Sequence, residues 1–168
     1  MGSSIVIMGV AGCGKSHIGA ALAVAEGWRL IEGDDFHSEA SRQKMSQGIP
    51  LTDADREGWL AELGRLLAAS PAPVVLTCSA LKRRYRDQLR AASPGLRFVF
   101  LQITREESLA RVAARASSHF FPAALVDNQF ATLESPVNEA DTLPLDATQT
   151  VEQLQRQISA WLHQGVRA

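Results

Sequence analysis

The chain has 168 residues, a formal net charge of −1 and a charged fraction of 21%. This length predicts a single domain over residues 1–168, large enough to bury a stable core without disulfides or structural metals. The near-neutral charge argues against nucleic acid as a partner, and the absence of a long apolar stretch argues against a membrane-spanning segment. The two cysteines lie in unlike settings, a glycine-rich loop and an apolar run, which favours a reducing, cytoplasmic location.

Five short apolar runs alternate along the chain with segments of helical spacing. The runs lie at residues 5–8, 28–31, 74–77, 98–103 and 143–145. This alternation predicts an α/β fold of three layers, in which a five-stranded parallel sheet carries helices on both faces. Helix starts are indicated by Thr52 with Asp55 and by Thr104 with Glu107, because both pairs have the spacing of a capping box.

The first apolar run leads into a loop that fits a phosphate-binding motif. Residues 9–16 have the spacing G-x-x-x-x-G-K-[ST], and the run before and the helical segment after provide the strand–loop–helix setting that the motif requires. Backbone N–H groups would cradle a triphosphate, Lys15 would reach its β- and γ-phosphates, and the Ser16 hydroxyl would ligate Mg²⁺. The predicted ATP-binding residues are Gly9, Val10, Ala11, Gly12, Cys13, Gly14, Lys15, Ser16 and His17.

Three acidic residues follow the second apolar run, where a parallel sheet presents its ligands. They are Glu32, Asp34 and Asp35. Phosphoryl transfer needs a carboxylate there, either to hold hydrated Mg²⁺ or to accept the proton of the acceptor hydroxyl. Alternation along an extended segment would place Glu32 and Asp34 on one side, so we predict Asp34 as base or acceptor anchor and Glu32 beside the metal. A solvated acidic turn that caps the next helix is the alternative, and Asp34 and Asp35 could exchange roles.

A basic run follows the third apolar run. It begins after Ser79 and contains Lys82 and Arg86, which are four residues apart and therefore predicted on one helix face. At this edge of the sheet an anionic substrate is a simpler partner than nucleic acid. We predict that Ser79, Lys82 and Arg86 face this substrate, and that Arg83 and Arg84 face water.

Further cations lie in two other segments. Arg56 has the planar fork of donors that suits a carboxylate or phosphate, although a surface pair with a neighbouring acid is the alternative. Arg111 and Arg115 precede a segment where small phosphotransferases close a lid, and we predict that they stabilise charge on the transferred group. His119 follows them as a candidate acid or base, with a structural hydrogen bond as the alternative reading.

Taken together, several segments resemble the gluconokinase family of small phosphate-loop sugar-acid kinases. Besides the loop, the residues that carry the resemblance are Gly33-Asp34 with His37, Lys44-Met45, Gly48 with Pro50-Leu51, Asp53-x-Asp55-Arg56-x-x-Trp59-Leu60, Cys78-Ser79-Ala80-Leu81-Lys82, Tyr85-Arg86-Asp87, His119-Phe120, Gln129-Phe130 and Leu133-Glu134. Two departures are Glu32, where the family often has Asp, and Ala116-Ser117-Ser118, which has one residue more than usual and no Gly before His119.

The resemblance implies a phosphate-loop kinase fold like that of shikimate and nucleoside-monophosphate kinases, with a lid over approximately residues 116–135. It implies Mg²⁺- and ATP-dependent phosphorylation of D-gluconate to 6-phospho-D-gluconate, feeding the pentose phosphate pathway, by a cytoplasmic homodimer. The implied substrate-binding residues are Asp34, His37, Arg56, Ser79, Lys82, Arg86 and His119. Another small-acceptor kinase, or an ATP-binding regulatory module without transfer activity, is the alternative.

Overall fold

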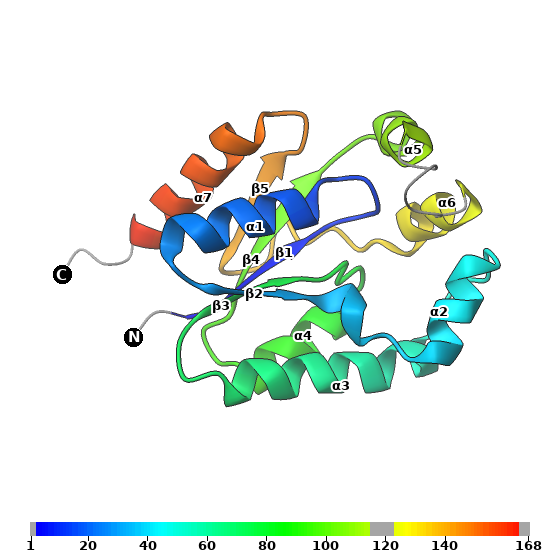
Figure 1. Ribbon diagram of the computed structural model, residues 1–168, viewed down its shortest axis with the longest axis horizontal. Helices are drawn as coiled ribbons and strands as arrows, with labels where there is room; N and C mark the ends of the chain where they lie inside the picture. Colours follow the sequence, from blue (N-terminus) through cyan, green and yellow to red (C-terminus); the bar gives the residue numbers. More distant parts are fainter. Residues whose placement is uncertain (1–2, 115–122, 165–168) are drawn as a thin grey trace.

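The computed structural model describes residues 3–114 and 123–164, which form a parallel sheet between two layers of helices (Figure 1). The strands are β1 (Ile5–Met8), β2 (Arg29–Glu32), β3 (Val74–Thr77), β4 (Arg97–Gln102) and β5 (Thr142–Asp146). They lie in the order β2-β3-β1-β4-β5, and every neighbouring pair is parallel. The predicted five-stranded parallel sheet is thus confirmed, with strand ends displaced by no more than one residue from the apolar runs.

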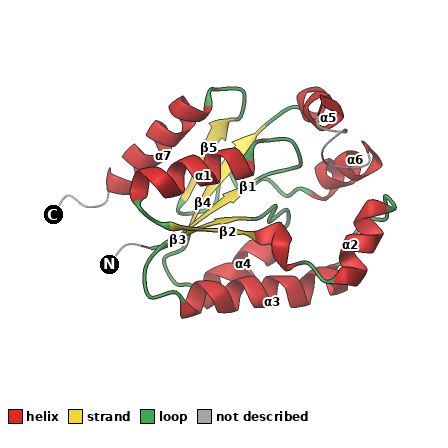
Figure 2. Cartoon of the chain, in the orientation of Figure 1, coloured by secondary structure: helices red, strands yellow, loops and turns green. Residues whose placement is uncertain are grey.

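The helices lie on both faces of this sheet and beyond the carboxyl ends of its strands, as Figure 2 shows. They are α1 (Lys15–Glu26), α2 (Glu39–Ser46), α3 (Asp53–Ala69), α4 (Arg83–Ala92), α5 (Arg105–Ala114), α6 (Ala123–Thr132) and α7 (Val151–Gln164). A short 3₁₀ turn spans Gly33–Phe36. No helix within the described ranges is long and apolar enough to cross a membrane.

Two apolar cores result from the alternation of side chains along the central strand β1. Ile5 and Ile7 pack with residues of α1 and α7, whereas Val6 and Met8 pack with residues of α3 and α4. Successive residues of a strand point to opposite faces, so a strand covered on both sides must be apolar throughout. All four residues of β1 are fully buried, which explains why the run could be recognised from the sequence.

The predicted helix start at Thr52 is a complete capping box in the structure. The Asp55 N–H donates to Thr52 Oγ1 at 3.1 Å, and the Thr52 N–H donates to Asp55 Oδ2 at 2.9 Å. At Thr104 one half of the box is present, because its hydroxyl oxygen accepts from the Glu107 N–H at 3.2 Å. The first box fixes the beginning of α3, which carries Arg56 and Trp59 toward the sheet edge.

The strand order has its topological switch point at β1, because β3 and β2 lie on one side of this strand and β4 and β5 on the other. Ligands of open α/β sheets bind at such a point. Three helices, α2, α5 and α6, lie beyond the carboxyl ends of the strands (Figure 1). The phosphate-binding loop leaves β1 at this same edge. The fold therefore brings the loop, the β2–α2 segment and α6 around one position.

Candidate active site

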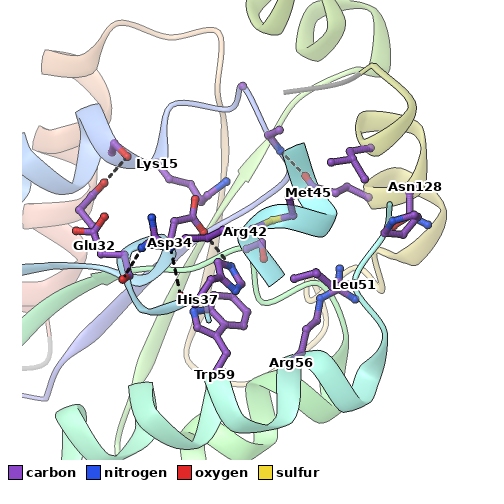
Figure 3. Close-up of a pocket in the computed structure, with 18 of the residues that line it drawn as sticks. Lys15, Glu32, Asp34, His37, Arg42, Met45, Leu51, Arg56, Trp59 and Asn128 are labelled. Carbon is purple, nitrogen blue, oxygen red and sulfur yellow. Dashed lines mark hydrogen bonds and ion pairs between the residues drawn. The ribbon is translucent and has the colours of Figure 1, made fainter. Parts of the chain in front are cut away.

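A cavity of about 410 Å³ opens at this edge of the sheet (Figure 3). Its walls come from the phosphate-binding loop, the segment after β2, α2, the start of α3 and α6. Most of the predicted nucleotide-binding residues line it. Gly9, Val10 and Cys13 do not, and the side chains of Val10 and Cys13 are buried in the core beneath the loop.

The loop has the geometry of an anion cradle. Gly12 and Gly14 have φ of 78° and 96°, a left-handed conformation that glycine adopts without strain. Gly14 precedes α1, and no side chain caps this end of the helix. The first-turn N–H groups of α1 are therefore available to a phosphate at the positive end of the helix dipole. Lys15 Nζ lies folded against the loop and donates to Gly9 O at 2.9 Å and to Val10 O at 3.1 Å.

Ser16 and Glu32 meet beside the loop, as predicted for a metal site. Ser16 Oγ donates to Glu32 Oε2 at 2.7 Å, and Thr77 Oγ1 donates to Glu32 Oε1 at 3.2 Å. Hydroxyl and carboxylate oxygens are the donors that Mg²⁺ prefers, and this ion usually completes its shell with water and phosphate oxygens. The two residues therefore fit Mg²⁺, although no cluster of three His, Cys, Asp or Glu ligands occurs within residues 3–114 and 123–164.

Asp34 lies across the cavity entrance from the loop, and its side chain is 80% exposed. His37 Nε2 lies 3.6 Å from Asp34 Oδ1, and the imidazole stacks on Trp59 with ring centroids 4.1 Å apart. The Trp59 Nε1–H donates to Gly33 O at 2.8 Å, which fixes the stacked pair under the turn that carries Asp34. His37 Nδ1 is buried without a hydrogen-bond partner among the described residues.

The net effect of these surroundings is to lower the pKa of Asp34. Desolvation raises the pKa, but the nearby imidazole of His37 and the positive charges of Lys15 and Arg42 outweigh it. Asp34 is therefore a carboxylate at neutral pH. A carboxylate with a lowered pKa accepts a hydrogen bond from a hydroxyl well, but it is a weak base.

The alternation argument that separated Asp34 from Asp35 does not apply, because the segment is a 3₁₀ turn and not an extended strand. Both side chains are exposed, and both residues line the cavity. They differ in their contacts, since Asp34 approaches His37 while the Asp35 carbonyl oxygen accepts from Arg42 Nη2 at 2.7 Å. Asp34 therefore remains the better-placed candidate.

Arg56 is buried at the base of the cavity, with 8% of its surface exposed. Its Nη1 donates to Tyr85 Oη at 3.2 Å, and its guanidinium carbon lies 5.6 Å from the centre of the Tyr85 ring. No carboxylate pairs with it in the part of the chain that the structure describes. The alternative of an exposed surface pair is therefore wrong, because this cation is buried and its acidic neighbour Asp55 pairs with Lys44.

The predicted substrate-binding role of Arg86 is wrong. Its side chain is completely buried and forms an ion pair with Glu139, with Nη2 at 2.6 Å from Oε2. Nη1 donates to Ala80 O and Leu81 O, and Nη2 also donates to Glu134 O. Since these contacts occupy the guanidinium and Arg86 does not line the cavity, it holds the β3–α4 turn instead of a ligand.

Lys82 also points away from the predicted position. It precedes α4 as the N-cap, and its Nζ pairs with Asp53 Oδ1 at 3.0 Å. The prediction that Lys82 and Arg86 lie on one helix face is wrong, because the helix begins only at Arg83. Ser79 does line the cavity, and Arg83 and Arg84 face solvent as predicted, with 68% and 70% of their side chains exposed.

The lid residues are described only in part. Arg111 Nη1 donates to Gly12 O at 3.2 Å and Nη2 to Ala147 O at 3.0 Å, so its guanidinium contacts main-chain carbonyls beside the loop. Arg115 and His119 lie outside the described residues, as does the predicted lid up to residue 122. From Ala123 on, α6 forms a wall of the cavity with Leu125, Asn128 and Gln129.

Several cavity residues had no assigned role in the sequence reasoning. They are Arg42, Met45, Pro50, Leu51, Trp59, Leu125, Asn128 and Gln129. Five of them belong to segments that carry the family resemblance, which was the available signal: Met45, Pro50, Leu51, Trp59 and Gln129. Arg42 belongs to no such segment, and only the folding of α2 over the cavity brings it there (Figure 3).

The loop, the Ser16–Glu32 pair and the Asp34 carboxylate have the arrangement expected of a phosphate-loop kinase of a small molecule. A family model described as "AAA domain" matches residues 5–136. The chain is 40% identical over 160 residues to "Thermosensitive gluconokinase" of Escherichia coli, covering 93% of this chain and 85% of that protein. It is 46% identical over 135 residues to "Gluconokinase" of Gluconobacter oxydans, covering 79% and 75% respectively.

Solved structures agree with these relatives. A gluconokinase from Sinorhizobium meliloti 1021 superimposes with a TM-score of 0.88 at 48% identity, over 95% of this chain and 91% of that one. The chain belongs to the gluconokinase family. A shikimate kinase from Aquifex aeolicus, with a TM-score of 0.61 at 15% identity over 97% and 98% of the two chains, shows the shared fold alone.

Proposed function

We propose that this chain transfers the γ-phosphoryl group of ATP to D-gluconate, giving 6-phospho-D-gluconate and ADP. One observation carries the proposal beyond family membership. The cavity that holds the phosphate-binding loop also holds a buried guanidinium, Arg56, without an acidic partner among the described residues. A buried cation in a binding cavity favours an anionic ligand, and the carboxylate of a sugar acid supplies the missing charge.

On the nucleotide side, the first-turn N–H groups of α1 bind the phosphates, and Lys15 leaves the loop carbonyls to contact them. Ser16 and Glu32 would hold Mg²⁺, which would supply positive charge to neutralise the phosphates. Arg111 and Arg115 stabilise charge on the transferred group. For Arg111 this role requires that its guanidinium turn from the Gly12 and Ala147 carbonyls toward the phosphate.

On the acceptor side, Arg56 binds the carboxylate, and Asp34 accepts a hydrogen bond from the hydroxyl that attacks the γ-phosphate. His37 positions Asp34, and Ser79 and His119 complete the substrate-binding set. Because proton removal is late in a largely dissociative transition state, orientation of the hydroxyl by Asp34 contributes more than basicity. The lowered pKa of Asp34 fits that division of labour.

A panel of acceptors in an ADP-release assay tests the proposal and separates its alternatives. We expect turnover with D-gluconate, hardly any with glucose because a neutral ligand leaves Arg56 unpaired, and none after chelation of Mg²⁺. Shikimate and AMP are themselves anions, so turnover with either one above that with gluconate would favour the alternative of another small-acceptor kinase. Lys15→Ala is the matched control, which should keep the fold and lose most transfer. Comparable kcat/KM for glucose, or no turnover with any acceptor, would contradict the proposal.

We also propose that the protein works as a cytoplasmic homodimer. The family resemblance supports this state, and the exposed apolar residues Val24 and Val151 provide surface for contact between copies. Light scattering at micromolar concentration measures the mass of the particle. A monomeric mass with full activity would contradict the dimer and leave the catalytic proposal intact.

A further inference from the structure

The Ala11 peptide, at the turn of the phosphate-binding loop, is held from both sides by the helices beyond the strand ends. Its N–H donates to Gln129 Oε1 of α6 at 2.6 Å, and its carbonyl oxygen accepts from Ser108 Oγ of α5 at 2.7 Å. Gln129 is 118 residues away in the sequence. Because the partner is an N–H donor, the Gln129 amide must present its oxygen, so its orientation follows from the contact.

This contact removes one donor from the phosphate cradle. In this structure the Ala11 N–H is already paired, so the N–H groups from Gly14 onward, at the start of α1, remain for the phosphates. What Gln129 determines is therefore the position of the loop turn relative to α6. It does not add a further ligand for the nucleotide.

The same helix also faces the acceptor half of the cavity. Leu125 and Asn128 line the cavity beside Gln129, and Figure 3 shows Asn128 on the side opposite Lys15 and Glu32. A ligand that packs against Leu125 and Asn128 thus contacts an element that is hydrogen-bonded to the phosphate-binding loop one residue further along. α6 is the physical connection between the two halves of the site.

The attachment of α6 to the rest of the fold does not depend on Gln129. Just beyond its end, the Glu134 N–H donates to Leu81 O at 2.8 Å, and Glu134 O accepts from Arg86 Nη2 at 2.8 Å. Val126 of α6 is fully buried. Loss of the Gln129 amide should therefore free the loop turn on the α6 side without releasing the helix, while Ser108 still holds the Ala11 carbonyl oxygen.

We propose that Gln129 is a positioning residue for phosphoryl transfer, which fixes the loop turn at Ala11 relative to Leu125 and Asn128, the neighbouring α6 residues that line the cavity. The proposal rests on the phosphoryl-transfer activity proposed above. It predicts that transfer depends on Gln129 more than nucleotide binding does, because the α1 N–H groups and Lys15 bind the phosphates in either case. Misplacement of reacting groups by about 1 Å can cost on the order of 100-fold in rate.

The test substitutes Gln129→Met, which keeps the length of the side chain and removes the amide acceptor. We expect kcat with gluconate to fall by about 10- to 100-fold, while the KM for ATP changes by less than roughly threefold. We also expect faster hydrogen exchange at the Ala11 amide in the ligand-free protein, which measures the contact without activity. Gln129→Ala, which introduces the strongest helix former, is a second variant should the first fold poorly.

Asp127→Asn is the matched control. It lies on the solvent side of the same helix and removes an ion pair with Arg105 of α5, so it tests general loosening of α6. Wild-type turnover in the same assay tests the proposed function separately. If wild type turns over and Gln129→Met retains kcat within twofold, the positioning role is excluded. A fall in kcat that Asp127→Asn reproduces, or that follows the loss of folded protein, would equally overturn it.

Discussion

Two regions of the molecule bury an arginine, and they treat the charge differently. On α4, Arg86 is paired with Glu139 and its remaining donors contact main-chain carbonyls. At the cavity, Arg56 has a phenol as its side-chain partner and no carboxylate among the described residues. The difference teaches that burial of a cation alone does not indicate a ligand site. What indicates it is a buried cation whose charge the fold leaves unpaired.

The energetics of buried charge explain the contrast. A charge taken out of water is costly unless it is paired and hydrogen-bonded. For Arg86 the fold supplies that pairing, and burial raises the pKa of Glu139 less than its contacts with Arg86 and Arg90 lower it. For Arg56 the side-chain partner among the described residues is the Tyr85 hydroxyl, which carries no charge. An anionic ligand can therefore form the ion pair that Arg56 lacks. The predictions below test this distinction.

The largest expected effect concerns the exposed acid of the cavity. Asp34→Asn keeps the size of the side chain and removes its charge, and we expect kcat to fall by about two to four decades. The KM for ATP should change little because the loop is untouched. Since the pKa of Asp34 is lowered, its protonation should not limit kcat between pH 5 and 8 in the wild type. Asp35→Asn is the control, and a larger loss there would exchange the roles of the two acids.

The second effect is on stability and concerns Arg86, the buried arginine that is paired with Glu139. Arg86→Met leaves Glu139 buried beside Arg90 alone, and we expect the free energy of unfolding to fall by about 3–5 kcal/mol. The folded fraction should keep its KM for gluconate. Denaturant unfolding and steady-state kinetics measure the two quantities, and adding Glu139→Leu should recover part of the stability. A tenfold higher KM for gluconate in the folded variant would return Arg86 to the acceptor site.

The third effect concerns Arg56, the buried arginine that has no carboxylate partner among the described residues. Arg56→Gln removes a charge that the fold leaves unpaired, so we expect unchanged or higher thermal stability without ligand. With gluconate, loss of a buried charge pair of about 2 kcal/mol or more should lower kcat/KM by roughly 30-fold or more. The shift of Tm by gluconate should disappear while the shift by ATP persists. A variant that is destabilised but binds gluconate normally would make Arg56 structural, like Arg86.

Arg56 and Arg86 also show how much could be predicted from the sequence alone. The strands of the sheet were predictable because β1 and β3 are buried on both faces and their residues are all or nearly all apolar. The loop was predictable because its function requires glycine, lysine and serine at fixed spacing. Resemblance to gluconokinases, confirmed by the comparisons, identified the family. In each case the signal is local or is a motif in the order of the chain.

Properties that depend on distant partners were not predictable. Whether Arg86 is satisfied depends on Glu139, 53 residues further along, and nothing in the basic run indicates it. The direction of the Asp34 side chain was predicted for an extended segment, but Asp34 lies in a 3₁₀ turn. The contact of Gln129 with Ala11 joins two motifs that the sequence presents separately. The motif residues Lys15 and Ser16 line the cavity, whereas the motif residue Lys82 does not, because Asp53 pairs with its ammonium group.

The smallest expected effect concerns the start of α3, which holds Arg56 in place. Asp55 accepts from Lys44 Nζ at 2.8 and 3.0 Å and from the Thr52 N–H, and these contacts lower its pKa to about 2. Because the folded pKa lies below the unfolded value of about 4, the stabilisation is complete above pH 4 and is lost as the pH falls toward 2. We expect Asp55→Asn to lower Tm by a constant amount from pH 5 to 8, and by progressively less below pH 4.

The control for this prediction lies on the same helix. Glu62 pairs with Arg65 on the exposed side of α3, so Glu62→Gln should change Tm less than Asp55→Asn does at neutral pH. Because the Thr52–Asp55 box fixes the first turn of α3, Asp55→Asn should also raise the KM for gluconate, whereas Glu62→Gln should not. Calorimetric melting from pH 2.5 to 8 measures the first comparison, and steady-state kinetics the second. A Tm difference for Asp55→Asn that persists undiminished at pH 2.5 would show that the ionised carboxylate is not its source.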